Sequence, residues 1–295
     1  MTSTIVRGKS GGFGSGLLRI ISRGPLHVVL IAVGLLWLLP SVGLFVSSFR
    51  PANLITTTGW WTAFTTPLQF TMQNYAHVLT QANMGRSFAN SLLIAVPATV
   101  MPILIAAFAG YAFAWMTFPG RNVLFLIVVG MLVVPLQMTL IPVLRLFNHL
   151  SLTGTFPGIW LAHTAYGLPF AVYLLRNFMG ELPGEMMESA ALDGATHGQI
   201  FFQLVLPTSV PALASLAIFQ FMWVWNDLLV ALIYLGGTPD VAPMTVTISS
   251  LVSSYGGGWE YLTSAAFVSM ILPLVVFFTL QKYFVRGILA GSVKE

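Results

Sequence analysis

Half of the acidic residues of this chain stand close together. Its 295 residues include eight aspartates and glutamates, and four of these are Glu181, Glu185, Glu188 and Asp193. Glu185 and Glu188 are three residues apart, so on a helix they share one face and can pair with basic side chains. The spacing predicts an acidic surface for docking a partner, with a solvated helical hairpin as the alternative.

Small residues lie among these acids and leave room for another backbone. They are Ala190, Ala191, Gly194 and Ala195. Because proline suits a first helical turn and glycine accepts the left-handed conformation of a helix end, we expect a short helix from about Pro183 to Gly194. A second short helix should follow, with one apolar face made of Ile200, Phe201, Leu204 and Val205.

A second polar set lies within long apolar stretches and has the chemistry to contact a solute. Asp227 is the one acid inside such a stretch, and a charge there costs about 2.5 kcal/mol or more. Gln220, Trp223 and Asp227 share one helical face, where an indole and polar groups would suit a carbohydrate. The candidates are Gln137, His163, Tyr166, Gln220, Trp223, Asn226 and Asp227. Packing and backbone hydrogen bonds are the alternative role for each.

Motifs for catalysis, nucleotide binding and metal binding are missing from the sequence. The triplet at 8–10, Gly-Lys-Ser, lacks the upstream glycine of a phosphate-binding loop. The five histidines have no metal-ligand spacing, and there is no cysteine. The net charge of +4 is scattered, which argues against nucleic acid. We therefore expect no catalytic residue, metal or cofactor in this chain, and an energy source in another chain or an ion gradient.

The composition indicates that most of the surface faces lipid. Apolar residues make up 57% of the chain and charged residues 7%, against roughly 25% charged in a soluble domain. A spanning helix needs about 20 mostly apolar residues. The sequence predicts an all-α integral membrane protein with six such helices, at about 26–49, 87–116, 122–146, 157–178, 209–236 and 261–284.

The segments between these spans read as tails and loops. Residues 1–25 are polar, basic and glycine-rich, as expected for a cytoplasmic tail, and 287–295 form a second tail. The uncharged segment 51–85 reads as an external loop. The longest internal connection is 179–208, which contains the acids.

The distribution of lysine and arginine sets the expected orientation. With the N-terminus inside, nine basic residues fall on the cytoplasmic side and three outside, which fits the positive-inside rule. The inner set is Arg7, Lys9, Arg19, Arg23, Arg121, Arg176, Lys282, Arg286 and Lys294, and the outer set is Arg50, Arg86 and Arg145. We therefore expect both termini and the acidic loop in the cytoplasm.

The acidic loop resembles a known sequence pattern. "ESAALDGA" (188–195), followed after five residues by "FFQLVLP" (201–207), is similar to the EAA loop of the membrane subunits of bacterial ABC importers, with Ser189 in place of the first alanine. Other segments resemble the carbohydrate-uptake branch, in particular its maltose-transporter G-type subunit. They are "NSLLIAV" (90–96), "AGYAFAWMTFPGR" (109–121), "WNDLLVAL" (225–232) and "QKYFVRGILAGSVKE" (281–295).

The resemblance implies a role for the loop. It would form the coupling helix that sits in a cleft of an ATPase subunit, where Glu188 would pair with a basic side chain and Gly194 would permit a tight turn. The ATPase-coupling residues would be Glu185, Glu188, Ala190, Ala191, Asp193, Gly194, Ala195 and Pro207. Residues of the C-terminal tail would also reach the ATPases, namely Gly291, Ser292, Val293 and Lys294.

The resemblance also implies an assembly and a function. A type I importer permease in the bacterial inner membrane would pair with a second permease subunit, two ATPases that use ATP and Mg²⁺, and an extracytoplasmic solute-binding protein. It would move a mono- or oligosaccharide by alternating access, without an ATPase of its own. The alternatives are the same architecture carrying another solute, such as a glycerol phosphodiester, and an ion-coupled secondary transporter.

Overall fold

The computed structural model describes residues 13–65, 69–80, 83–251 and 257–290, and gives the backbone alone for 13–23, 280 and 282–290. The described part is helical and contains no strand. The first half consists of α1 (Phe13–Ser48), α2 (Ala52–Thr57), a 3₁₀ turn (Trp60–Phe64), α3 (Gln73–Thr80), α4 (Met84–Trp115), α5 (Arg121–Met131) and α6 (Leu136–His149). The second half consists of α7 (Phe156–Gly180), α8 (Gly184–Leu192), α9 (His197–Ile200), a π-helix (Phe201–Val205), α10 (Leu206–Thr208), α11 (Val210–Trp225), α12 (Leu229–Leu235), α13 (Met244–Ser249) and α14 (Trp259–Ala290).

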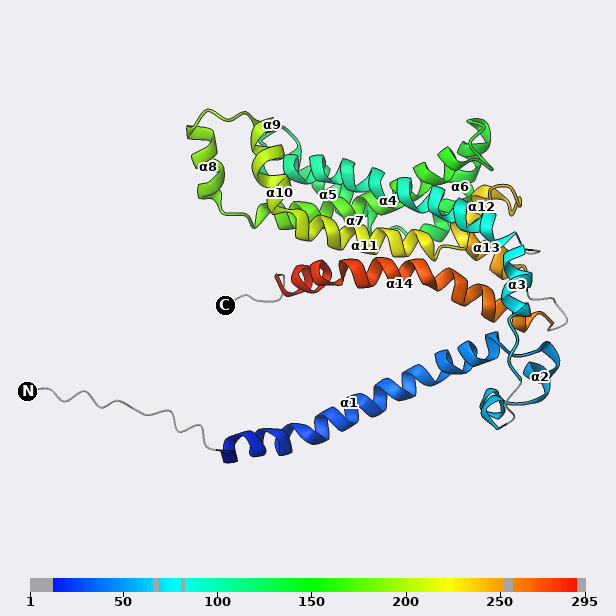
Figure 1. Cartoon of the computed structure of the whole chain (residues 1–295). Helices are drawn as coiled ribbons and strands as arrows, with labels where there is room; N and C mark the ends of the chain where they lie inside the picture. The colour runs from blue at the N-terminus through cyan, green and yellow to red at the C-terminus, as the bar shows by residue number, and fades with distance from the viewer. Residues whose placement is uncertain (1–12, 66–68, 81–82, 252–256, 291–295) are drawn as a thin grey trace, which may run out of the picture.

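The long helices run between two ends of the molecule (Figure 1). The start of α1, the close of α14 and all of α8 lie at one end, which we call the α8 end. The short helices α2, α3 and α13 lie at the other, the α3 end. The predicted tail positions Gly291, Ser292, Val293 and Lys294 lie outside the described residues.

Within the described residues, four helices are long and apolar enough to cross a membrane, and up to six spans result if two bent pairs are each counted as one. The four are residues 24–48 of α1, α4, α7 and residues 259–279 of α14. The bent pairs are α5 with α6 and residues 197–208 with α11. The all-α membrane fold predicted from the sequence is therefore confirmed.

The sequence predicted a single helix at 122–146, but the structure has two helices joined by a sharp bend. Helices α5 and α6 meet at an angle of 101°, with Pro135 at the start of α6. Proline has no N–H for the helical bond and disfavours helical geometry in the residue before it, so the apolar run breaks there.

Two other expected elements also differ in the structure. Helix α1 already begins at Phe13, inside the segment expected as a tail. The span expected at 209–236 is interrupted between α11 and α12 at residues 226–228. The first difference has a simple cause, because apolar helix formers such as Leu17 and Leu18 extend the pattern toward the N-terminus.

Close packing of α4, α7 and α11 forms the centre of the molecule (Figure 1). A Cβ added to Gly110 on α4 would lie 3.1 Å from the backbone nitrogen of Arg176 on α7. A Cβ added to Gly167 on α7 would lie 2.5 Å from Gln220 Oε1 on α11. Both glycines therefore permit a helix contact that a side chain would obstruct.

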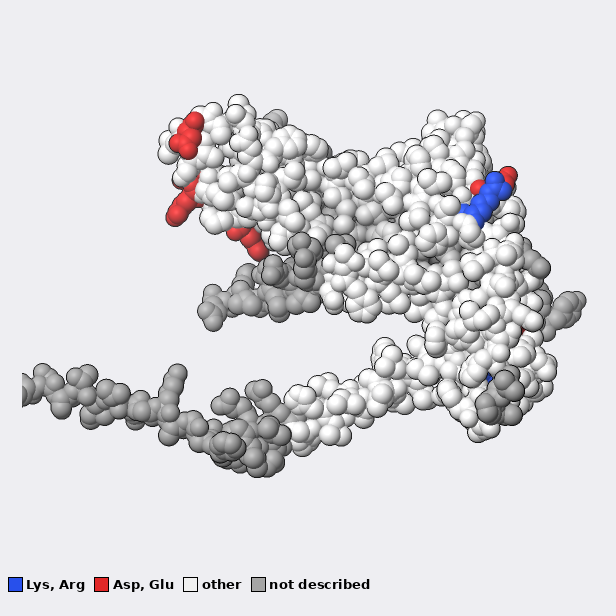
Figure 2. All heavy atoms as spheres, in the orientation of Figure 1, with Lys and Arg blue, Asp and Glu red and all other residues white. Residues whose placement is uncertain are grey.

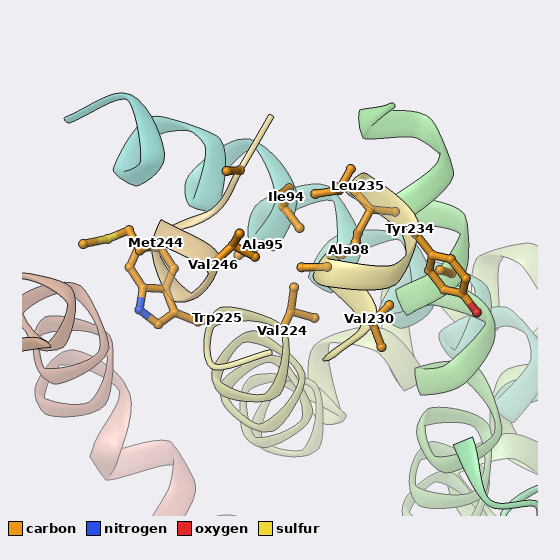
Figure 3. Close-up of a cluster of buried hydrophobic side chains, with 14 of the residues drawn as sticks. Ile94, Ala95, Ala98, Val224, Trp225, Val230, Tyr234, Leu235, Met244 and Val246 are labelled. Atoms are coloured by element: carbon orange, nitrogen blue, oxygen red, sulfur yellow. The ribbon is translucent and has the colours of Figure 1, made fainter. Parts of the chain in front are cut away.

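The chain folds back on itself near the α3 end. After α12, the loop and α13 return to the bundle, where Met244 and Val246 pack beside Trp225 of α11 (Figure 3). Ile94, Ala95 and Ala98 of α4 close the same cluster. Hydrogen bonds secure the return, since the Asn90 side chain donates to the carbonyls of Asp240 and Ala242.

A buried arginine organises the α3 end. The guanidinium of Arg50 donates to the carbonyls of Leu54 and Thr58 and to the hydroxyls of Thr58 and Thr62. Arg50 is completely buried, and desolvation lowers its pKa below the usual value. Backbone, hydroxyl and amide oxygens, rather than a carboxylate, therefore accept from the two terminal nitrogens of this guanidinium and hold α1 to the short helices.

Helix α1 stands apart from the bundle (Figure 1). Only 6% of its candidate span is buried, against 56% for α7. Its contacts with the rest of the chain concentrate near its C-terminal end, where Phe45 packs edge-on against Phe267 of α14 at 5.1 Å. Most of the apolar surface of α1 is therefore open to lipid or to another chain.

Candidate functional site

The predicted helix of small residues and acids is present and ends as expected. Helix α8 begins after Pro183, and Gly194 has a φ of +80°. The N–H of Ala195 donates to the Ala190 carbonyl and the N–H of Gly194 to the Ala191 carbonyl, both at 3.0 Å. These two bonds form a Schellman motif, which requires the left-handed residue that glycine supplies at no steric cost. We call residues 179–208 the acidic segment.

The acids of this segment face solvent. Glu181, Glu185, Glu188 and Asp193 are exposed, and acidic side chains gather at the α8 end of the molecule (Figure 2). Among the described residues, no lysine or arginine forms a salt bridge with them. Leu192, between them in the sequence, is 89% exposed. A charged surface with an apolar residue at its edge is suited to a basic partner.

The predicted second helix is more elaborate than its sequence indicated. Thr196 and Gln199 form a capping box that starts α9, a Thr-x-x-Gln signal that the sequence reasoning missed. A π-helix follows at 201–205, and then α10; the whole segment 197–208 meets α11 at an angle of 70°. The predicted apolar face is confirmed by burial: Ile200, Phe201 and Val205 are buried and Leu204 is half-buried.

Two hydrogen bonds join the acidic segment to α4. Trp115 Nε1 donates to the Met179 carbonyl at 2.7 Å, and the Tyr111 hydroxyl lies 3.0 Å from His197 Nδ1. The ring of Tyr111 also packs against Phe201 at 5.3 Å. The segment 109–121 carried a family resemblance, but no local pattern indicated the contacts of Tyr111 and Trp115, because their partners lie 86 and 64 residues away.

The candidate acid Asp227 caps a half-helix. Its carboxylate oxygens accept from the Val230 nitrogen at 3.2 Å and from the Ala231 nitrogen at 2.9 Å, in the first turn of α12. Thr245 donates to the Asp227 carbonyl at 2.6 Å and so connects this break to α13. The acid thus satisfies N–H groups that the interrupted span would otherwise leave unpaired.

Three further candidates form a group linked to Asp227 through His163. His163 is buried, with Nε2 at 3.8 Å from Asp227 Oδ2, and the Trp223 ring meets the imidazole edge-on at 5.3 Å. Gln220 donates to the His163 carbonyl at 3.4 Å and to the Ala98 carbonyl at 3.1 Å. A cavity of about 10 Å³ beside His163 and Asp227 has room for one water and none for a sugar.

The remaining candidates lie elsewhere or face outward. Tyr166 bonds the Tyr234 hydroxyl at 2.7 Å and receives a bond from Thr139 at 3.0 Å, so it joins α6, α7 and α12. Gln137 and Asn226 are exposed. The structure therefore brings Gln220, His163, Trp223 and Asp227 together and places Gln137 and Tyr166 outside that group. Tyr234, Thr139 and Thr245 are polar partners that the sequence reasoning did not name.

Comparison with known proteins gives the family. Residues 25–290 match the model of the family described as "Binding-protein-dependent transport system inner membrane component". The chain is similar in fold to a membrane chain of a bacterial ABC transporter that imports the acidic polysaccharide alginate, with a TM-score of 0.65 at 19% identity, covering 92% of this chain and 98% of that one.

Two curated relatives are much closer in sequence. The osmoprotective compounds uptake permease protein GgtD of Synechocystis sp. is 62% identical over 274 residues, 92% of each chain. The alpha-glucoside transport system permease protein AglG of Rhizobium meliloti is 60% identical over 235 residues, 78% of this chain and 62% of the relative. The chain therefore belongs to the family of inner-membrane components of binding-protein-dependent transport systems, as a multi-pass ABC transporter permease.

Proposed function

We propose that the chain is a permease subunit of an ATP-driven importer for α-glucosides, including glycosides that serve as osmoprotectants. The solute class rests on the two relatives named for alpha-glucosides and for osmoprotective compounds, each at least 60% identical. Their names favour a sugar over the phosphodiester alternative, and the family favours ATP over an ion gradient.

The exposed acidic helix α8 is the observation that supports coupling to an ATPase. Glu185 and Glu188 have no basic partner among the described residues, and the Schellman turn at Gly194 holds the helix end in one geometry. A basic cleft of a separate ATPase subunit would pair with these carboxylates. Hydrolysis of ATP with Mg²⁺ there would move α8, and the tail 287–295 would reach the same subunits.

The open surface of α1 supports a second permease subunit as partner. Residues 24–48 are strongly apolar yet almost unburied, and Trp37 is 80% exposed. Another permease chain would cover this face and complete the solute pathway. In the proposed orientation, both termini and α8 are cytoplasmic, and the α3 end receives solute from a binding protein.

Within the pathway, the buried and exposed candidates take different roles. Trp223 and Asn226 are exposed beside the α11–α12 break and would contact the sugar, with Gln137 exposed at the start of α6. The buried residues His163, Gln220 and Asp227 would hold the broken span in position.

Reconstitution tests this function directly. The chain is assembled in proteoliposomes with the permease, ATPase and binding-protein subunits encoded beside it, and maltose, trehalose and sucrose are each tested by calorimetry on the binding protein. We expect at least one of these α-glucosides to bind, to stimulate ATP hydrolysis and to accumulate inside the vesicles. Binding of none of them would refute the solute class, and sugar binding without stimulated hydrolysis would refute the coupled importer.

A further inference from the structure

We infer that α4 is the helix that carries motion from the acidic segment to the opposite side of the membrane, and that Tyr111 and Trp115 are the residues that fasten it. The inference rests on the proposed function, since it concerns how a displacement of α8 reaches the solute pathway. It assigns positioning roles to Tyr111 and Trp115, which bond His197 and the Met179 carbonyl of this chain.

The two side chains hold the chain on either side of α8. Trp115 donates to the carbonyl of Met179, in the last turn of α7 just before the segment turns toward α8. Tyr111 bonds His197, the first residue of α9 just after α8 has ended. Residues 111 and 115 are one helical turn apart and therefore share a face of α4.

The tyrosine contact is supported by packing. Tyr111 is buried, and its ring contacts Phe201, which in turn lies 4.9 Å from Phe108, also on α4. A tyrosine hydroxyl can donate to or accept from Nδ1, so the bond with His197 holds for either imidazole tautomer. The aromatic contacts fix the ring, and the hydroxyl adds the specific connection.

The opposite end of α4 is fastened as well. The Asn90 side chain bonds the carbonyls of Asp240 and Ala242, Ser87 bonds Thr247 at 2.6 Å, and Ser91 accepts from the Met244 nitrogen. These partners belong to α13 and the loop before it, which connects through Thr245 to the Asp227 break. With 1.5 Å per residue, the 32 residues of α4 extend about 48 Å, enough to cross the membrane.

These hydrogen bonds connect α4 directly to the residues on either side of α8, a connection that the covalent chain does not provide. Along the chain, α8 connects to α7 and, through a π-helix and a 70° bend, to α11. Helix α4 receives motion from α8 through the contacts of its own C-terminal half, with the bonds of Tyr111 and Trp115 on either side of α8. Without these bonds, α8 would move while α4 lagged behind, and ATP would be hydrolysed without transport.

The test is the ratio of sugar transported to ATP hydrolysed in the reconstituted importer with its binding protein, using as the radiolabelled probe whichever of maltose, trehalose and sucrose the binding protein binds most tightly. Tyr111→Phe removes one hydroxyl and keeps the ring, and Trp115→Phe removes the indole N–H. Each bond is worth a net 0.5–1.5 kcal/mol, so we expect the ratio to fall about two- to tenfold while ATP hydrolysis persists. Tyr173→Phe, at an exposed α7 tyrosine, is the matched control and should keep the wild-type ratio.

A double-mutant cycle tests whether Tyr111 and His197 act through their shared hydrogen bond, which we call the α4 clamp together with the Trp115 bond, or act independently. His197→Ala should lower the ratio in the wild-type background and have no further effect in Tyr111→Phe, because the same bond is already missing. His197→Asn, whose side-chain oxygen takes the place of Nδ1, should restore the ratio. Additive effects of the two substitutions, or a wild-type ratio in Tyr111→Phe, would overturn the inference.

Two measurements separate this result from other failures. Retention of the ATPase subunits on affinity purification and an unchanged melting temperature show that a low ratio in Tyr111→Phe is a coupling defect. Loss of either in this variant would assign the tyrosine to fold stability and overturn the positioning role. If the wild-type complex shows no sugar-stimulated ATP hydrolysis, the proposed function fails. If the wild-type complex shows it, and Tyr111→Phe and Trp115→Phe both keep the wild-type ratio of sugar to ATP, only the inference about α4 fails.

Discussion

Replacing Gly194 by alanine isolates the contribution of one backbone conformation to coupling. An added Cβ at this position meets nothing within 4 Å, so the substitution causes no steric clash with neighbouring residues. Its cost comes from the φ of +80°, which disfavours a residue with a Cβ by about 1–2 kcal/mol. That energy corresponds to a loss of about 5- to 30-fold in the population that keeps the Schellman turn.

The assay is sugar-stimulated ATP hydrolysis in proteoliposomes, together with retention of the ATPase subunits on purification. We expect Gly194→Ala to weaken both, while insertion into the membrane persists because the substitution lies outside the spans. Gly194→Asn should retain more activity than alanine, since asparagine tolerates the left-handed region better.

Gly180→Ala is the matched control, because its Cβ also meets nothing within 4 Å and its φ is not positive. It should behave as wild type. If Gly194→Ala also matched wild type, or if alanine and asparagine were equally impaired, the backbone argument would be refuted.

Three further substitutions test separate parts of the molecule. Glu188→Lys reverses an exposed carboxylate of α8 and should abolish sugar-stimulated ATP hydrolysis with normal insertion; intact coupled transport would contradict the docking role. Asp227→Ala removes the cap of α12 and should cost about 0.5–2 kcal/mol, read as a lower melting temperature in detergent, whereas an unchanged melting temperature would contradict the capping role. Arg50→Met removes the charged hydrogen bonds from the buried guanidinium to the carbonyls of Leu54 and Thr58, at about 1.5–3 kcal/mol, and should speed proteolysis of the segment 51–65. Arg86→Met, which breaks an exposed salt bridge, is its control and should leave proteolysis unchanged.

Features that depend on neighbouring residues were the most accessible from sequence. The end of α8 at Gly194 follows from glycine and proline chemistry over about a dozen positions, and the helices α4, α7 and α14 follow from hydropathy. The bend at Pro135 had a local signal too, but a hydropathy window averages over a single proline. The capping box at Thr196 was likewise present in the sequence as a Thr-x-x-Gln spacing.

Features that depend on distant residues were not accessible. The partner of Tyr111 lies 86 residues away and that of Tyr166 lies 68 residues away, so no periodicity indicates either contact. The sequence marked Asp227 as unusual because charges in spans are costly. It did not reveal that both carboxylate oxygens bond the turn that follows, because that required knowing where the helix breaks.

The isolation of α1 has a consequence for assembly. Apolar surface gains nothing by leaving lipid, so a spanning helix finds its place by packing, and α1 packs on its own chain mainly near one end. The contacts of this chain therefore fix the C-terminal end of α1 near Phe45 and leave the rest of the helix with little packing of its own. In the assembly proposed above, a second permease subunit would supply the packing that α1 lacks along most of its length, so the angle of α1 would depend on that partner.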